Sequence, residues 1–313
     1  MLNARRRGQL SAAATIGALV VAAASTAGAG AQPAESIARD GKLPLRWTAE
    51  TPDCANARPF LVHAYNPAFI ILRQSGCTNF EKPFLYLLLG SKEALLVDTG
   101  APGADASAAV DDLLRGYAQR QHSAVLPLVA VHSHGHSDHT AGDRELTRRG
   151  ARVVEATPKA LQEFFHIKDW PHDVGRYDLG ERRLEIIPIP GHQGASIAIY
   201  DERTQLLLTG DTLYPGRLFV RDAAAFTESI DRLVAFTASH DVSHVFGAHI
   251  ENTRTPYLDY PEGTAFQPDE HALELGRAHL LELQDALRGM GQQLQRRRFR
   301  DFTIWPVAPA PPG

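Results

Sequence analysis

Residues 132–139 read His-Ser-His-Gly-His-Ser-Asp-His, so this short segment holds four imidazoles and one carboxylate. Neutral imidazole nitrogens and carboxylate oxygens are preferred ligands of Zn²⁺ and similar cations. His134 and His136 alternate along an extended chain that leaves an apolar strand, so both side chains can face one metal ion. Asp138 and His139 follow where the chain curls into a helix, from which they can reach a second ion. The segment therefore predicts a metal site.

Further candidate ligands occur later in the chain, and each one follows an apolar strand. They are His192 after the strand at 184–189, Asp211 after the strand at 205–208 and His249 after the strand at 242–246, with Asp98 at the end of an earlier strand at 93–98. With the HxHxDH motif of residues 134–139, these segments resemble the metallo-β-lactamase superfamily of hydrolases. The resemblance runs from about residue 60 to about residue 250.

The resemblance implies a ligand set and a fold. It assigns His134, His136 and His192 to a first metal ion, Asp138, His139 and His249 to a second, Asp211 to a bridge between them, and Asp98 to a place beneath the ligands. Zinc is the default metal, with two ions expected, and such sites also accept iron, manganese or cobalt. The implied fold class is α+β, an αββα sandwich of two mixed sheets with helices outside.

The ligands also imply a mechanism. Two ions bridged by Asp211 would share a water, lower its pKa and generate a metal-bridging hydroxide that attacks a carbonyl. Asp138 is the candidate to orient that hydroxide or carry its proton. Tyr214, three residues beyond Asp211, is the second catalytic candidate. Its hydroxyl can bond the substrate carbonyl, or its ring can simply pack the loop.

The bridging aspartate separates this chain from the true β-lactamases, which generally lack it, and favours members similar to lactonases and glyoxalase II. The first hypothesis is therefore a hydrolase of a small-molecule ester, lactone or thioester. An iron-dependent oxidoreductase of the persulfide dioxygenase type is one alternative on the same scaffold. A binding protein without catalytic activity is the other.

The N-terminus predicts export. Residues 1–31 carry Arg5, Arg6 and Arg7, no acidic residue, an apolar stretch at 12–24 and small residues at the end, which is typical of a secretory signal peptide cleaved after Ala31. The paired arginines resemble a twin-arginine signal, and the apolar stretch also suits the general route. We expect a periplasmic or secreted protein; an uncleaved membrane anchor is the alternative.

Removal of residues 1–31 leaves 29 basic and 36 acidic residues, a formal charge of −7 that gives no indication of nucleic-acid binding. Cys54 and Cys77 both remain after processing. In an oxidising compartment they can form a disulfide, and two free buried thiols are the alternative.

The remaining pattern predicts one catalytic domain. We assign residues 32–57 to an N-terminal arm, 58–295 to the catalytic domain with its C-terminal helix, and 296–313 to a tail. The domain begins with a β-meander at 59–98 and contains helices at 104–119, 223–239 and 268–295.

Overall fold

The computed structural model describes residues 40–47, 54–291 and 293–307. The chain divides into two units, Met1–Ser36 and Ile37–Gly313, and every described residue belongs to the second. The predicted signal peptide at 1–31 and part of the predicted arm at 32–57 lie outside the described residues. Cleavage and export therefore stay predictions.

The first six-stranded sheet has its strands in chain order, from β1 to β6. Its first four strands pair antiparallel, as the meander prediction requires, and the last two join in parallel. A parallel neighbour requires a crossover, which helix α1 (Ser107–Gln121) supplies. The strands are β1 (Phe60–Asn66), β2 (Phe69–Gln74), β3 (Phe84–Leu89), β4 (Ala94–Val97), β5 (Leu128–Val131) and β6 (Arg152–Val153).

The second six-stranded sheet has the order β13-β12-β10-β9-β8-β7. Its pairs are antiparallel except for β10 and β12, which helix α5 (Ala223–Thr237) connects as a parallel pair. The strands are β7 (Gly175–Asp178), β8 (Arg183–Pro188), β9 (Ile197–Asp201), β10 (Leu206–Gly210), β12 (His244–Gly247) and β13 (Glu274–Leu275).

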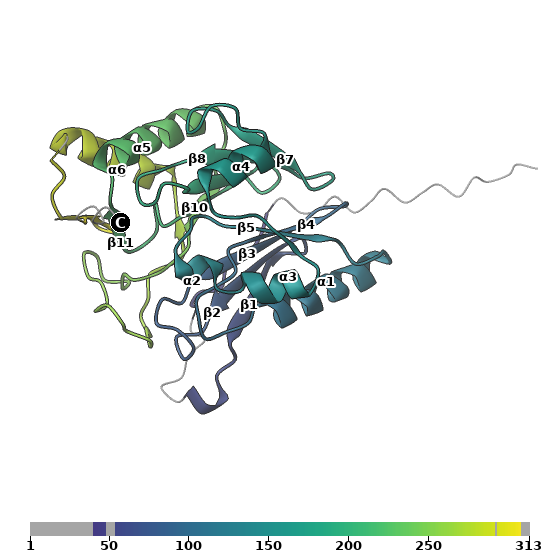
Figure 1. Ribbon diagram of the computed structural model, residues 1–313. Helices are drawn as coiled ribbons and strands as arrows, with labels where there is room; N and C mark the ends of the chain where they lie inside the picture. The colour runs from purple at the N-terminus through teal and green to yellow at the C-terminus, as the bar shows by residue number, and fades with distance from the viewer. Residues whose placement is uncertain (1–39, 48–53, 292, 308–313) are drawn as a thin grey trace, which may run out of the picture. The chain divides into compact units, whose positions relative to one another are not determined.

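Alternation along the strands creates three apolar layers. On β2, Phe69 belongs to the core between the sheets, whereas its neighbour Ile70 packs on the side of α1. On β8, Ile186 belongs to the central core, whereas Ile187 packs on the side of α5 and α6 (Arg277–Met290). The order is helix, sheet, sheet, helix (Figure 1), which confirms the predicted αββα sandwich.

The shorter helices are η1 (Cys54–Asn56), α2 (Ser137–Thr140), α3 (Asp143–Arg148) and α4 (Pro158–Phe165). Thr157 caps α4 by accepting a hydrogen bond from the Ala160 N–H, and Asp222 caps the longer α5 in the same way through the Ala225 N–H.

The prediction of one long helix over 268–295 is wrong, because α6 is the only helix among the described residues of this range and it begins at Arg277. The residues before α6 find backbone partners elsewhere: the His271 N–H donates to the Asn252 carbonyl at 2.8 Å, and Leu275 pairs with Val245 in the sheet. These bonds compete with helical ones, so the helix starts only after Gly276.

The predicted tail at 296–313 is folded in part, and its residues 308–313 lie outside the described residues. A small third sheet contains β11 (Arg217–Val220), β14 (Arg297–Arg298) and β15 (Thr303–Pro306), in the order β11-β15-β14. Phe302 and Ile304 are fully buried in the apolar layer beneath α5 and α6. Their burial holds this segment on the domain. The sequence does not reveal this, because the prolines that follow are typical of an unpacked tail.

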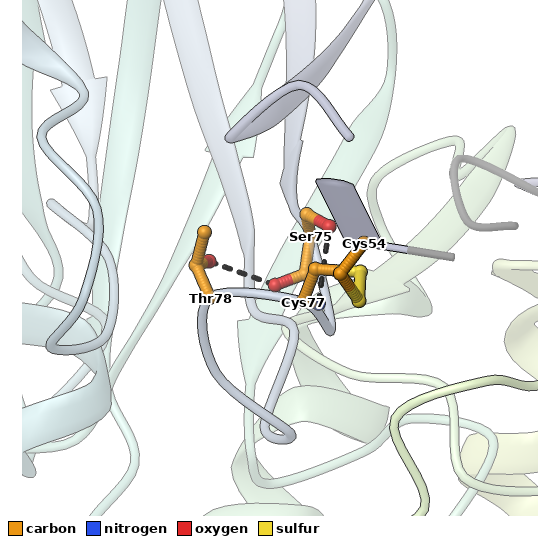
Figure 2. Close-up of a disulfide and its surroundings, with 4 residues drawn as sticks. All are labelled: Cys54, Ser75, Cys77 and Thr78. Atoms are coloured by element: carbon orange, nitrogen blue, oxygen red, sulfur yellow. Dashed lines mark hydrogen bonds between the residues drawn. A yellow bond between two sulfur atoms is a disulfide. The ribbon is translucent and has the colours of Figure 1, made fainter. Parts of the chain in front are cut away.

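Cys54 and Cys77 form a disulfide with Cα atoms 5.4 Å apart (Figure 2). Beside it, the Cys77 N–H donates to Ser75 Oγ at 3.1 Å and the Thr78 hydroxyl donates to the Ser75 carbonyl at 2.8 Å. The bonded pair fits the disulfide alternative rather than two free thiols.

Among the described residues, no helix combines the length and apolar character needed to span a bilayer.

Candidate metal centre

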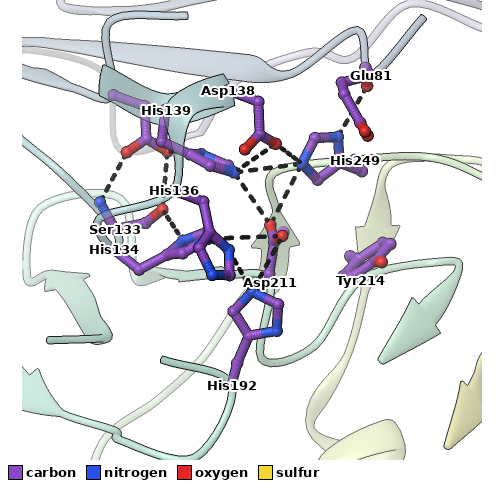
Figure 3. Close-up of polar contacts among 12 residues, drawn as sticks. Glu81, Ser133, His134, His136, Asp138, His139, His192, Asp211, Tyr214 and His249 are labelled. Carbon is purple, nitrogen blue, oxygen red and sulfur yellow. Dashed lines mark hydrogen bonds and ion pairs between the residues drawn. The ribbon is translucent and has the colours of Figure 1, made fainter. Parts of the chain in front are cut away.

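The first group of candidate ligands consists of His134 and His136 in the loop after β5, and His192 in the loop after β8. Their ring nitrogens converge (Figure 3): His136 Nδ1 lies 2.8 Å from His134 Nε2 and 3.1 Å from His192 Nε2. Nitrogens this close are spaced like the ligands around one Zn²⁺ at about 2.0–2.1 Å. This group can therefore hold a metal ion.

Local backbone geometry places His192 against α5. The preceding Gly191 has φ of 139°, and a Cβ there would come within 2.5 Å of the backbone of Phe226. Only glycine fits this position, because any side chain would have to displace the first turn of the helix. The Pro-Gly-His sequence thus brings the ring to the metal centre.

The second group contains Asp138 and His139 on α2, with Asp211 after β10 and His249 after β12. Asp138 Oδ2 lies 3.0 Å from His139 Nε2 and 3.3 Å from His249 Nε2, and the two imidazole nitrogens are 3.4 Å apart. Two imidazoles and two carboxylates at this spacing can hold a second cation.

Asp211 lies between the two groups (Figure 3). Its Oδ2 faces the first group, 3.8 Å from His134 Nε2 and 3.6 Å from His192 Nε2. Its Oδ1 faces the second, 3.6 Å from His139 Nε2 and 3.4 Å from His249 Nε2. This buried Oδ1 accepts no hydrogen bond within the described part of the chain. A buried carboxylate oxygen without a donor is costly, so the donor set fits a pair of cations here.

Asp98 supports the ligands from below. It follows β4 with φ of 64°, a left-handed conformation that aspartate tolerates better than most residues. Asp98 Oδ2 lies 3.0 Å from His139 Nδ1 and accepts from Ser133 Oγ at 2.9 Å, while Oδ1 accepts from the Ser133 N–H at 2.7 Å. These bonds fix the His139 ring with Nε2 directed at the metal centre.

Backbone carbonyls orient two more rings. His192 Nδ1 donates to the Phe219 carbonyl and His249 Nδ1 donates to the Glu81 carbonyl, each at 2.8 Å. With Nδ1 occupied as a donor, Nε2 of each ring is left as the metal-binding nitrogen.

The two groups differ in electrostatics. Burial, reinforced by neighbouring histidines, holds the pKa of His134 well below its usual range and lowers that of His136 to about 4. Burial also opposes a charge on His139 and His249, but surrounding carboxylates outweigh it and raise the pKa of His249 to about 9. Burial would likewise favour a neutral Asp211, yet the adjacent histidines hold its pKa well below its usual range.

The structure brings all seven sequence-predicted ligand positions together, with Asp98 beneath them. Tyr214 lies beside His249, but its hydroxyl points away from Asp211 (Figure 3). That hydroxyl donates to the Arg217 carbonyl at 2.5 Å and lies 3.2 Å from Glu251 Oε2. In this arrangement it does not face the two ligand groups.

Sequence reasoning missed Glu81 and Arg217. Glu81 lies beside His249 (Figure 3), and burial raises the pKa of its carboxyl group, against the lowering effect of His249. Arg217 Nη2 donates to Glu251 Oε1 at 2.9 Å on the same side of the centre. No motif marks these residues, because their proximity arises only when distant loops meet.

Residues 80–245 match the family model described as metallo-beta-lactamase superfamily. The match covers more than half of the chain and includes six of the seven candidate ligands, with His249 just beyond it. The chain therefore belongs to the metallo-beta-lactamase superfamily.

Characterised relatives are hydrolases by name. The chain is 30% identical over 213 residues to the hydroxyacylglutathione hydrolase of Chromohalobacter salexigens, covering 65% of this chain and 76% of that protein. It is 28% identical over 165 residues to the bovine acyl-coenzyme A thioesterase MBLAC2, covering 43% of this chain. The chain spans 59% of the length of that thioesterase.

Solved structures share the fold. A metallo-beta-lactamase from Pontibacter korlensis superposes with a TM-score of 0.50 at 17% identity, covering 73% of this chain and 99% of that one. A metallo-beta-lactamase from Erythrobacter litoralis gives a TM-score of 0.50 at 14% identity, covering 76% of this chain and 100% of the other. At these identities the likeness concerns the fold alone.

Proposed function

We propose that this protein is a metal-dependent hydrolase of small-molecule thioesters, esters or lactones, with two metal ions in its working form. The observation that carries the proposal is the position of Asp211, whose two oxygens face two separate ligand groups. The default cation is Zn²⁺, since imidazole and carboxylate are its common ligands.

Zinc ions bound by these two groups would lower the pKa of water towards neutrality and polarise the substrate carbonyl. The chain's own groups hold and orient the reactants. Asp138, the least buried carboxylate of the two ligand groups, can orient the attacking water or carry its proton to the leaving group. His139 Nε2 and His249 Nε2 lie 3.0 Å and 3.3 Å from Asp138 Oδ2 and hold this carboxylate in place.

Thioesters stand first among the substrates. Both named relatives act on acyl groups carried by thiols, one on hydroxyacylglutathione and the other on acyl-coenzyme A. The β-lactamase likeness rests on structures of 17% identity or less and supports no substrate. The bridging Asp211 also points to the thioester and lactone hydrolases rather than to β-lactamases.

The protein is further proposed to work outside the cytoplasm. The sequence predicts a cleaved export signal at 1–31, and the disulfide between Cys54 and Cys77 is of the kind that persists in oxidising compartments. Both observations support a periplasmic or secreted location.

The test combines metal analysis with a panel of substrates. The exported protein is purified without chelator, its zinc, iron and manganese are measured, and it is assayed with an aryl thioester, an aryl ester, a homoserine lactone and a chromogenic β-lactam. We expect about two equivalents of zinc and fastest turnover of the thioester. A single iron without hydrolysis of any of these would contradict the proposal.

The matched variants are Asp211→Asn and His172→Ala. His172 is exposed and lies outside both ligand groups, so its replacement controls for loss of a histidine as such. We expect His172→Ala to retain wild-type zinc and turnover, and Asp211→Asn to lose both. Equal activity of the two variants would exclude Asp211 from the working centre.

A further inference from the structure

A small cavity lies beside the second ligand group. It is lined by Glu81 and Lys82, by Arg217 of β11, by Ile250 and Glu251 directly after His249, and by the loop at 261–267. The Glu81 carbonyl accepts from the His249 ring, so one wall of the cavity is joined to the metal centre. The cavity therefore adjoins the second ligand group.

Most polar groups around the cavity are already held in place. Lys82 Nζ donates to the Thr264 carbonyl at 2.7 Å and to the Phe80 carbonyl. Arg217 forms ion pairs with Glu251 at 2.9 Å and with Asp259 at 2.8 Å. These bonds fix the walls and neutralise much of the positive charge of Arg217.

Two acceptors remain without donors, and one buried donor of a lining residue, Arg217 Nε, remains without an acceptor within the described residues. Within the described residues, the Glu81 carboxylate accepts no hydrogen bond and forms no ion pair, and Figure 3 shows it alongside the His249 ring. Gln267 is only 8% exposed, and its Oε1 has no partner within the described chain. Both side chains line the same cavity, so the cavity offers a ligand two hydrogen-bond acceptors that no protein donor uses.

The charges of the lining side chains and the volume of the cavity limit the kinds of ligand that fit. Three acidic and two basic side chains line the cavity, and both basic ones are engaged as donors. The cavity volume is about 40 Å³, enough for a group the size of a few water molecules rather than an acyl chain. A small cationic donor satisfies these conditions, whereas an anion would meet the Glu81 carboxylate.

We propose that this cavity is a recognition subsite for an ammonium group of the substrate, with Glu81 as its ion-pair partner and Gln267 Oε1 as a second acceptor. The inference rests on the proposed hydrolase function and deepens it. The preferred substrate is an acyl compound that carries a primary amine a few bonds from the scissile carbonyl.

Binding is tested separately from turnover with three anilides, whose amide bond resists hydrolysis. β-Alanine anilide carries an ammonium, butyranilide carries a methyl group of similar size in its place, and succinanilic acid carries a carboxylate. Dissociation constants for the zinc-loaded protein are measured by ligand-observed NMR. We expect β-alanine anilide to bind roughly 10- to 100-fold more tightly than butyranilide, as a hydrogen bond to a charged group warrants.

The variant Glu81→Gln should reduce this preference to below about threefold, because the amide retains the shape without the charge. Glu262→Gln is the matched control, since Glu262 also lines the cavity but is exposed. It should keep most of the preference. Equal binding of the first two anilides to the wild type, tighter binding of succinanilic acid, or an unchanged preference in Glu81→Gln would each overturn the proposal.

The S-phenyl thioesters of β-alanine and butyric acid are then assayed on the same samples. Failure to hydrolyse either thioester counts against the proposed function, while the anilide ranking still decides the subsite. If both thioesters are hydrolysed at equal kcat/KM and the first two anilides bind equally, the proposed hydrolase function stands and the proposed ammonium subsite is refuted.

Discussion

The two ligand groups share Asp211 but are built differently. The first uses three imidazoles whose pKa values are lowered by burial, so they are neutral and ready to bind a cation near neutral pH. The second surrounds two imidazoles with carboxylates, which raise the pKa of His249 to about 9. The first group is therefore set to bind a cation directly, whereas the second must first lose a proton.

The largest expected effect comes from removing the residue that the two groups share. Asp211→Ala should abolish turnover, with a loss beyond the roughly 10- to 100-fold that an outer partner of a ligand costs. His134→Ala should do the same through the first group alone. Steady-state kinetics and zinc content test both, and circular dichroism checks the fold. Retained full activity in either variant would refute the two-ion mechanism.

A change of pH should alter the zinc affinity of the second ligand group more than that of the first. Below about pH 9 the His249 ring holds a proton that a cation must displace, so the affinity of the second group falls by about tenfold per pH unit for each proton displaced. His136 stays neutral down to about pH 4. Zinc content after dialysis against buffered zinc should decrease from about two equivalents towards one as the pH is lowered from 9 to 5. Loss of both zinc ions over the same pH range would contradict the proposed difference between the two ligand groups.

Replacement of Asp98 should have a smaller effect, which again differs between the zinc affinities of the two ligand groups. Asp98→Asn weakens the partner of His139 Nδ1, so zinc affinity of the second group should fall by about 10- to 100-fold, with a smaller change in the first. Competition with a chromogenic chelator measures both affinities. Asp112→Asn, which changes an exposed carboxylate paired with Arg115, is the control and should change neither affinity. An Asp98 variant that matches this control would show that the bond does not tune the site.

Tyr214→Phe should have the smallest effect on catalysis. The hydroxyl bonds the Arg217 carbonyl and Glu251, so its loss should destabilise the fold by about 1 kcal/mol and change kcat by less than about threefold. Denaturant unfolding and kinetics check these values. A fall in kcat of a hundredfold with an intact fold would instead place the hydroxyl on the substrate.

The candidate ligand set could be predicted from the sequence because each candidate lies in a short local pattern after an apolar strand, as His192 does in Pro-Gly-His. The sandwich followed from strand spacing and the family resemblance. Glu81 could not be predicted, because its contact with His249 joins positions 168 apart in the chain. The segment before α6 was missed for a similar reason: Leu275 pairs with Val245 only after the sheet has formed.

The ligands come from both halves of the sandwich, and this has a consequence for how the protein matures. His134, His136, Asp138 and His139 follow β5 of the first sheet, whereas His192, Asp211 and His249 follow strands of the second. During synthesis neither group is complete until a residue of the second sheet has emerged and docked. Each bound ion would then cross-link the two sheets, so metal loading would report the last step of assembly and would oppose its reversal.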